Sequence, residues 1–96
     1  MESLESLRRK IDPIDQKLLE ILAMRWQIVR KMGQLKTQKN IKIRQPEREK
    51  VVLADREKKS GTLGLPPKLT RQIFQTLFRA AAALQKEEFD TRPKKE

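Results

Sequence analysis

A single apolar stripe along the first third of this chain constrains its fold more than any other feature. Successive stripe positions are three or four residues apart, which is the spacing of one face of an α-helix. The stripe consists of Leu7, Ile11, Ile14, Leu18, Leu22, Arg25, Val29, Met32 and Lys36. Two members, Arg25 and Lys36, are cationic, and a cation is costly to bury unless an anionic group meets it. The pattern therefore indicates a helical core that receives an anionic guest.

The stripe predicts one long helix over 4–38. Such a helix is about 50 Å long at 1.5 Å per residue. A chain of 96 residues cannot bury a stripe of that length alone, so we expect a partner chain. Asp12 and Pro13 also fit a helix start, but the stripe keeps its phase between Ile11 and Ile14. A continuous helix through Pro13 is therefore favoured.

Two shorter helices are expected after the long one. The second spans 46–59, because Pro46 suits the first helical position and Ser60 and Gly61 suit a helix end. The third spans about 67–89, where apolar residues recur at helical spacing and four consecutive alanines favour a helix. The chain is therefore predicted to be all-α. Residues 1–90 form one domain, and the charged tail at 91–96 is expected to be disordered.

Composition limits the chemistry that this chain can perform. It has no His and no Cys, which excludes disulfides, thiolate nucleophiles and the usual zinc sites, and also removes the commonest general acid or base. The net charge of +10 favours anionic partners, although a solvated basic surface explains it equally well. No apolar run reaches the ~20 residues that span a bilayer, and no signal-peptide pattern opens the chain. We therefore expect a cytoplasmic protein without a membrane partner.

Each polar candidate also has an ordinary structural explanation. Arg25 can lie along the core edge with its charged head in water. Arg48 and Glu49 can be a solvated first turn, with Glu49 favoured by the helix dipole. Gln85, on an apolar face, can be a satisfied core amide or a donor aimed into a pocket. From the pattern alone, Arg8 is a surface charge.

Five motifs in order resemble the AroQ class of all-helical chorismate mutases. They are LRRKIDPID at 7–15, LLEILAMR at 18–25, Lys36, PERE at 46–49, and Ile73-Phe74 followed by Gln85. Each motif alone is weak, but the five together cover about residues 4–89. The resemblance implies three helices, one long, one short and one medium, in an intertwined homodimer. It also implies the rearrangement of chorismate to prephenate, with no cofactor.

The resemblance also assigns roles to individual residues. Arg25 and Arg48 would bind substrate carboxylates, and Arg8 would reach into the site of a second copy. Lys36 and Gln85 would donate hydrogen bonds to the ether oxygen.

Glu49 would accept a hydrogen bond from the ring hydroxyl. Two positions depart from the pattern of many relatives: Gln45 stands where they have an acidic residue, and Ala81 stands where some have a serine.

Other functions remain open at this level. An isochorismate-pyruvate lyase on the same fold would use a similar set of side chains, although Glu49 in the PERE motif favours the mutase. A basic nucleic-acid-binding module would explain the net charge, but the aromatic residues are few and no helix-turn-helix spacing is evident. A purely dimerising scaffold would leave Arg25 and Lys36 unexplained.

Overall fold

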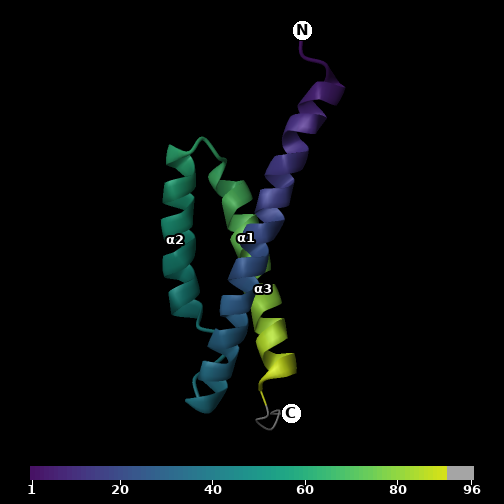
Figure 1. Cartoon of the computed structure of the whole chain (residues 1–96). Helices are drawn as coiled ribbons and strands as arrows, with labels where there is room; N and C mark the ends of the chain where they lie inside the picture. Colours follow the sequence, from purple (N-terminus) through teal and green to yellow (C-terminus); the bar gives the residue numbers. More distant parts are fainter. Residues whose placement is uncertain (91–96) are drawn as a thin grey trace.

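The computed structural model describes residues 1–90, and this part of the chain is built from three α-helices (Figure 1). They are α1 (Leu4–Gln38), α2 (Pro46–Thr62) and α3 (Pro67–Glu88). The prediction of one long, one short and one medium helix is therefore confirmed. The charged tail at 91–96 lies outside the described residues.

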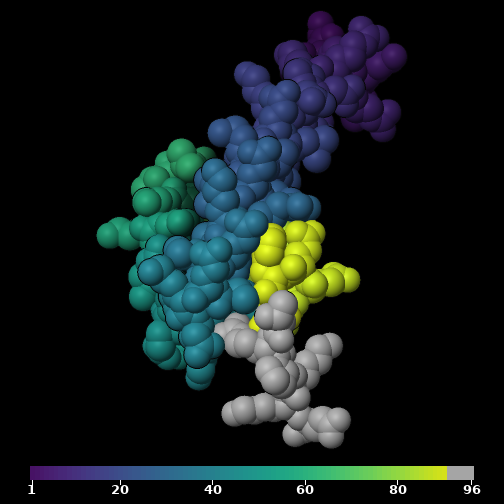
Figure 2. Space-filling view, turned by 60° about the horizontal axis from the view of Figure 1, so that its bottom comes forward, coloured from purple at the N-terminus to yellow at the C-terminus, as the bar shows by residue number. Residues whose placement is uncertain are grey.

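The helices run alternately down, up and down, and α3 packs against both α1 and α2 (Figure 1). The molecule is elongated, measuring 61 × 25 × 23 Å with a radius of gyration of 17.2 Å. A compact chain of this length has a radius of gyration of about 12.5 Å. The excess comes from the first part of α1, which projects beyond the other two helices (Figure 2).

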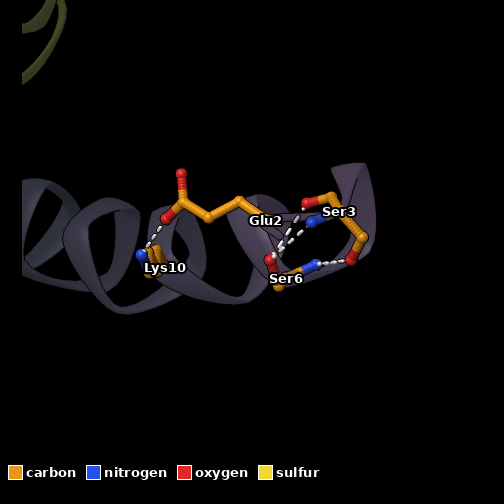
Figure 3. A network of polar contacts seen from close by, with 4 residues as sticks. All are labelled: Glu2, Ser3, Ser6 and Lys10. Carbon is orange, nitrogen blue, oxygen red and sulfur yellow. Dashed lines mark hydrogen bonds and ion pairs between the residues drawn. The ribbon is translucent and has the colours of Figure 1, made fainter.

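The projecting end of α1 begins with a reciprocal cap (Figure 3). The Ser3 hydroxyl accepts a hydrogen bond from the backbone N–H of Ser6 at 3.0 Å, and the Ser6 hydroxyl accepts one from Ser3 N–H at 3.1 Å. This arrangement satisfies backbone donors that a helix start otherwise leaves unpaired. An ion pair between Lys10 and Glu2 lies beside it. The helix then continues through Pro13, as predicted from the phase of the stripe.

The first two helices end in the same way. Asn40 and Gly64 take left-handed backbone conformations, with φ of 54° and 78°. The following residue donates its N–H back to the last turn, from Ile41 to Lys36 O at 2.7 Å and from Leu65 to Ser60 O at 2.9 Å. This is the Schellman arrangement for closing a helix.

The predicted end of α2 at residue 59 was too early by three residues. Gly64, rather than Gly61, adopts the left-handed conformation, so Ser60 and Gly61 remain inside the helix. The third helix ends at Glu88, one residue before the expected end.

One chain buries few apolar side chains. The buried apolar residues among 1–90 are Val29, Ile43, Ala82 and Leu84, all near the end of α1 and the second half of α3. By contrast, the stripe residues of the projecting half of α1 are open to solvent, Ile14 being 63% exposed and Leu18 53%. No helix in the described part of the chain is both long enough and apolar enough to cross a membrane.

Candidate active site

A cavity of about 440 Å³ lies where all three helices and the loop between α1 and α2 meet. Seven of the eight residues selected from the sequence line it: Arg25, Lys36, Gln45, Arg48, Glu49, Ala81 and Gln85. The eighth, Arg8, lies in the exposed projecting half of α1. It precedes Arg25 by 17 residues of continuous helix, or about 25 Å. A single chain therefore does not bring Arg8 into the cavity.

The two cations of the stripe face this cavity from α1. Both side chains are half-buried, and burial lowers the pKa of Lys36 and of Arg25 because it disfavours their charged forms. The charge of Glu49 opposes this effect on Lys36, whereas the charge of Arg56 adds to it on Arg25.

The Lys36 ammonium is held in a fixed position by two acceptors. Its Nζ donates to the backbone carbonyl of Ile43 at 2.8 Å and to Oε1 of Gln85 at 3.1 Å. The first acceptor follows the end of α1, and the second comes from α3. An ammonium group has three donor hydrogens, so one remains for a ligand in the cavity.

Gln85 connects α3 to α1 and is almost completely buried, with 2% of its surface exposed. Its Nε2 donates to the backbone carbonyl of Val29 at 2.9 Å, while its Oε1 accepts from Lys36. The amide group carries a second N–H beyond the one given to Val29. Both the core role and the pocket role considered for this residue are therefore compatible with its position.

Gly33 allows Gln85 to approach α1 closely. A Cβ at residue 33 would lie 2.8 Å from Cγ of Gln85 and 2.7 Å from Cδ2 of Phe89. Only a residue without a side chain fits there unless the side chains of Gln85 and Phe89 move. The position of the buried amide therefore depends on a glycine one turn before Lys36.

Glu49 is held by an arginine that the sequence analysis did not select. Arg44 donates from Nε to Oε2 of Glu49 at 2.7 Å and from Nη2 to Oε1 at 2.6 Å. This paired, charge-assisted contact fixes the plane of the carboxylate, and it raises the pKa of Arg44. Arg44 lies in an irregular loop, so no periodic signal in the sequence pointed to it.

The remaining walls come from the start of α2 and from α3. Gln45 is the N-cap residue of α2, but its side chain makes no capping hydrogen bond, and it lines the cavity together with the exposed Arg48. Ala81 contributes a methyl group from α3 and no hydrogen-bonding side chain. Of the two positions that depart from the pattern of many relatives, Gln45 therefore places an amide at the cavity and Ala81 places an apolar surface there.

The cavity is strongly cationic. Its lining includes the charged groups of Arg25, Lys36, Arg44, Arg48 and Arg56, against the single carboxylate of Glu49. Within residues 1–90, no group of three or more His, Cys, Asp or Glu side chains is placed to hold a metal ion. The donor set is thus suited to a small anion with more than one negative group.

Fold and site together define a three-helix protein with a cationic pocket whose donor groups suit a small anion. The family model described as chorismate mutase type II matches residues 7–86. The chain belongs to this family, which confirms the relationship inferred from the sequence motifs.

Three relatives differ in how much of their length this chain covers. It is 34% identical to a protein named chorismate mutase from Methanocaldococcus jannaschii over 91% of this chain and 88% of the relative. It is 38% identical to a T-protein of Enterobacter agglomerans over 79% of this chain. It is 31% identical to a bifunctional chorismate mutase/prephenate dehydratase of Aquifex aeolicus over 90% of this chain. The chain spans only 20% of the T-protein and 25% of the bifunctional protein.

Proposed function

We propose that this protein catalyses the rearrangement of chorismate to prephenate as a step in aromatic amino acid biosynthesis in the cytoplasm. The observation that carries the proposal is the pairing of Lys36 with Gln85 inside a cavity that four arginines also line. Membership of the type II chorismate mutase family supports it. The reaction is unimolecular and needs no nucleophile, which agrees with a chain that has neither His nor Cys.

The arginines hold the substrate in a reactive conformation. Chorismate carries two carboxylates, and the forked donors of arginine match carboxylate geometry. Arg25 on α1 and Arg48 on α2 approach the cavity from different helices. Carboxylates bound at two such points would keep the reacting carbons close, which lowers the entropic part of the barrier.

Lys36 supplies the electrostatic part of catalysis. Negative charge develops on the ether oxygen as the C–O bond breaks, and the free Nζ hydrogen of Lys36 would stabilise it. The free amide hydrogen of Gln85 would donate to the same oxygen. Because both side chains are already fixed by Ile43 and Val29, they need little reorganisation during the reaction. One preorganised donor of this kind contributes about 2.7–4 kcal/mol to barrier lowering.

Glu49 orients the ring of the substrate. Its carboxylate would accept a hydrogen bond from the ring hydroxyl while Arg44 holds it from the other side. Gln45, beside it at the start of α2, offers an amide group for the same hydroxyl. These contacts would select the substrate by its hydroxyl position.

A second copy of the chain would complete the fold. The projecting half of α1 exposes aliphatic side chains at every stripe position from Leu7 to Leu18, and burying them against an identical helix is favourable by about 25 cal/mol per Å². In an intertwined homodimer, the same half would carry Arg8 into the site of the other copy. The assembly would therefore contain two sites, each formed mainly by one chain.

An assay with two substrates tests the proposal. Purified protein is incubated separately with chorismate and with isochorismate, and the products are separated by chromatography. We expect prephenate from chorismate and little salicylate or pyruvate from isochorismate. If salicylate and pyruvate form from isochorismate faster than prephenate forms from chorismate, the protein is a lyase and not a mutase. Absence of turnover on both substrates would overturn the enzymatic assignment.

A further inference from the structure

Arg56 is a cavity residue for which the sequence motifs gave no role. It follows Arg48 by eight residues on α2, and Val52 lies midway between them. Residues four apart lie on the same face of a helix, and all three line the cavity. Arg56 therefore extends the cationic wall that begins with Arg48 by about two turns.

The guanidinium of Arg56 is positioned by contacts from two helices. On α2 it forms an ion pair with Asp55, and on α3 its Cζ lies 5.9 Å from the centroid of the Phe74 ring. Asp55 also pairs with Lys59, at 3.1 Å, so its carboxylate is shared between two cations. Hydrogen bonds from Arg56 and Lys59 hold the pKa of Asp55 below its usual range. The side chain of Arg56 is half-buried and oriented before any ligand arrives.

Arg25 and Arg56 line the same cavity, and the charge of Arg56 acts on Arg25. The charge of Arg56 is the second cause, after burial, of the lowered pKa of Arg25. Two guanidinium groups at one cavity repel each other in the absence of a ligand. A carboxylate placed between them would relieve that repulsion and gain hydrogen bonds from both.

We propose that Arg56 binds a substrate carboxylate together with Arg25, so that a single chain supplies a two-arginine clamp for that group. This inference rests on the proposed function, since it assumes a dicarboxylate substrate. Within the clamp, Arg25 approaches from α1 and Arg56 from α2. The clamp thus links two helices that otherwise meet through α3.

Arg56→Ala and Arg56→Lys test the clamp, with Arg71→Ala as the matched control. Arg71 is an arginine on α3 that pairs with Glu57 on α2 and does not line the cavity. Chorismate turnover is measured by loss of substrate, and binding of prephenate, the dicarboxylate product, is measured by calorimetry. We expect Arg56→Ala to raise KM and the Kd for prephenate by about tenfold to a hundredfold, because a lost hydrogen bond to a charged group has this effect on binding.

We expect Arg56→Lys to retain part of the affinity and Arg71→Ala to bind as the wild type does. A structural role is separated from a binding role by thermal unfolding with and without prephenate. Arg56→Ala should keep most of the ligand-free midpoint but lose much of the upward shift that prephenate produces.

Equal KM and equal prephenate affinity in the wild type and Arg56→Ala would overturn the clamp. So would a matching loss of affinity in Arg71→Ala. A wild-type protein that binds prephenate but does not convert chorismate would contradict the proposed function instead, while the prephenate titrations would still decide the role of Arg56.

Discussion

The two halves of α1 carry the same stripe but use it differently. In the first half the stripe is aliphatic and exposed, whereas in the second half it contains Arg25 and Lys36 and packs against α3. Val29, in the second half, is 5% exposed, while Ile14, in the first, is 63% exposed. Under the proposed function, one periodic pattern would serve two purposes, with chemistry on the half that the chain covers itself and assembly on the half that it leaves open.

The difference indicates that side-chain type, rather than periodicity, would distinguish the proposed site from the proposed interface. Aliphatic residues in phase can be covered by any complementary apolar surface, so the first half suits a second copy. Cations in phase need specific acceptors, and Lys36 finds them in Ile43 and Gln85. Substitutions in the two halves of α1 should therefore differ in their main effect, on turnover in the second half and on assembly in the first.

The largest effect is expected from Lys36→Ala in the second half. It removes the proposed donor to the ether oxygen, so kcat/KM for chorismate should fall at least about a hundredfold. Arg25→Ala should lower kcat/KM to a similar degree through loss of a carboxylate contact. Steady-state kinetics measure both effects, and sedimentation should show unchanged assembly.

Lys31→Ala is the matched control for Lys36→Ala, because Lys31 is an exposed lysine of the same helix outside the cavity lining. Near-wild-type turnover in Lys36→Ala would show that the site is assigned to the wrong residues.

Ile14→Glu, in the first half, should weaken assembly rather than the chemical step. An ionised carboxylate in an apolar interface costs several kcal/mol, so the dimer Kd should rise at least about a hundredfold. Activity should then depend on protein concentration, because the proposed contribution of Arg8 requires a second copy. Sedimentation equilibrium and dilution assays measure these effects.

Glu20→Lys, a charge change at an exposed position outside the stripe, serves as the control for Ile14→Glu and should leave assembly intact. A variant Ile14→Glu that assembles as the wild type does would contradict the proposed interface.

The dependence on pH should separate catalysis from stability. Burial lowers the pKa of Lys36 below its ordinary value of 10.5, so kcat/KM should fall as the pH rises through the lowered value. Between the two values the unfolded chain binds more protons than the folded one, so this lysine makes the folded state more stable as pH rises toward 10.5. Kinetics and urea unfolding from neutral pH to 10.5 measure the two trends. If kcat/KM does not fall over this range of pH, Lys36 is not the proposed donor.

Gly33→Ala should loosen the contact between the second half of α1 and α3. Overpacking against Gln85 and Phe89 should cost about 1–3 kcal/mol of stability, partly offset by about 1 kcal/mol of helix propensity. Gly61→Ala is the control, because that position has no neighbour within 4 Å of the added Cβ, and it should stabilise α2 by about 0.5–1 kcal/mol. Denaturant unfolding measures both. Equal gains in stability in the two variants would show that the side chains of Gln85 and Phe89 move aside without cost.

The smallest effect is expected at the tip of the first half. Ser3→Ala removes the hydroxyl that caps α1 and should cost about 0.5–1 kcal/mol, whereas Ser3→Asp should restore most of the loss. Circular dichroism and denaturant unfolding measure the change. A loss much above 2 kcal/mol would mean that the first turn is packed rather than projecting.

The sequence predicted the helices well, because the stripe sets both the length and the phase of α1. The predicted end of α2 was wrong, because composition could not tell whether Gly61 or Gly64 would take the left-handed conformation. The family was predicted from five ordered motifs and is confirmed by the family match. The homodimer, the location and the individual residue roles stay predictions.

The site was predicted less completely than the fold. Seven selected residues line one cavity, but Arg44 was missed because an irregular loop has no period to reveal it. Arg56 shares a helix face with Arg48 and could have been found from their spacing of eight residues. The carbonyls of Val29 and Ile43 that hold Gln85 and Lys36 could not be found in this way, because every residue has such a group.

The unbroken helix through Pro13 has a consequence for how this chain can vary in length. Each residue turns an α-helix by about 100°, so deleting one residue between Leu18 and Arg25 would rotate the exposed stripe away from the cationic positions. Removing a full heptad would restore the phase to within about 20° but would shorten the reach of Arg8 by about 10 Å. A point substitution along α1 therefore changes one position and leaves the phase of the helix intact, whereas an insertion or deletion would change how the two halves face each other in a single step.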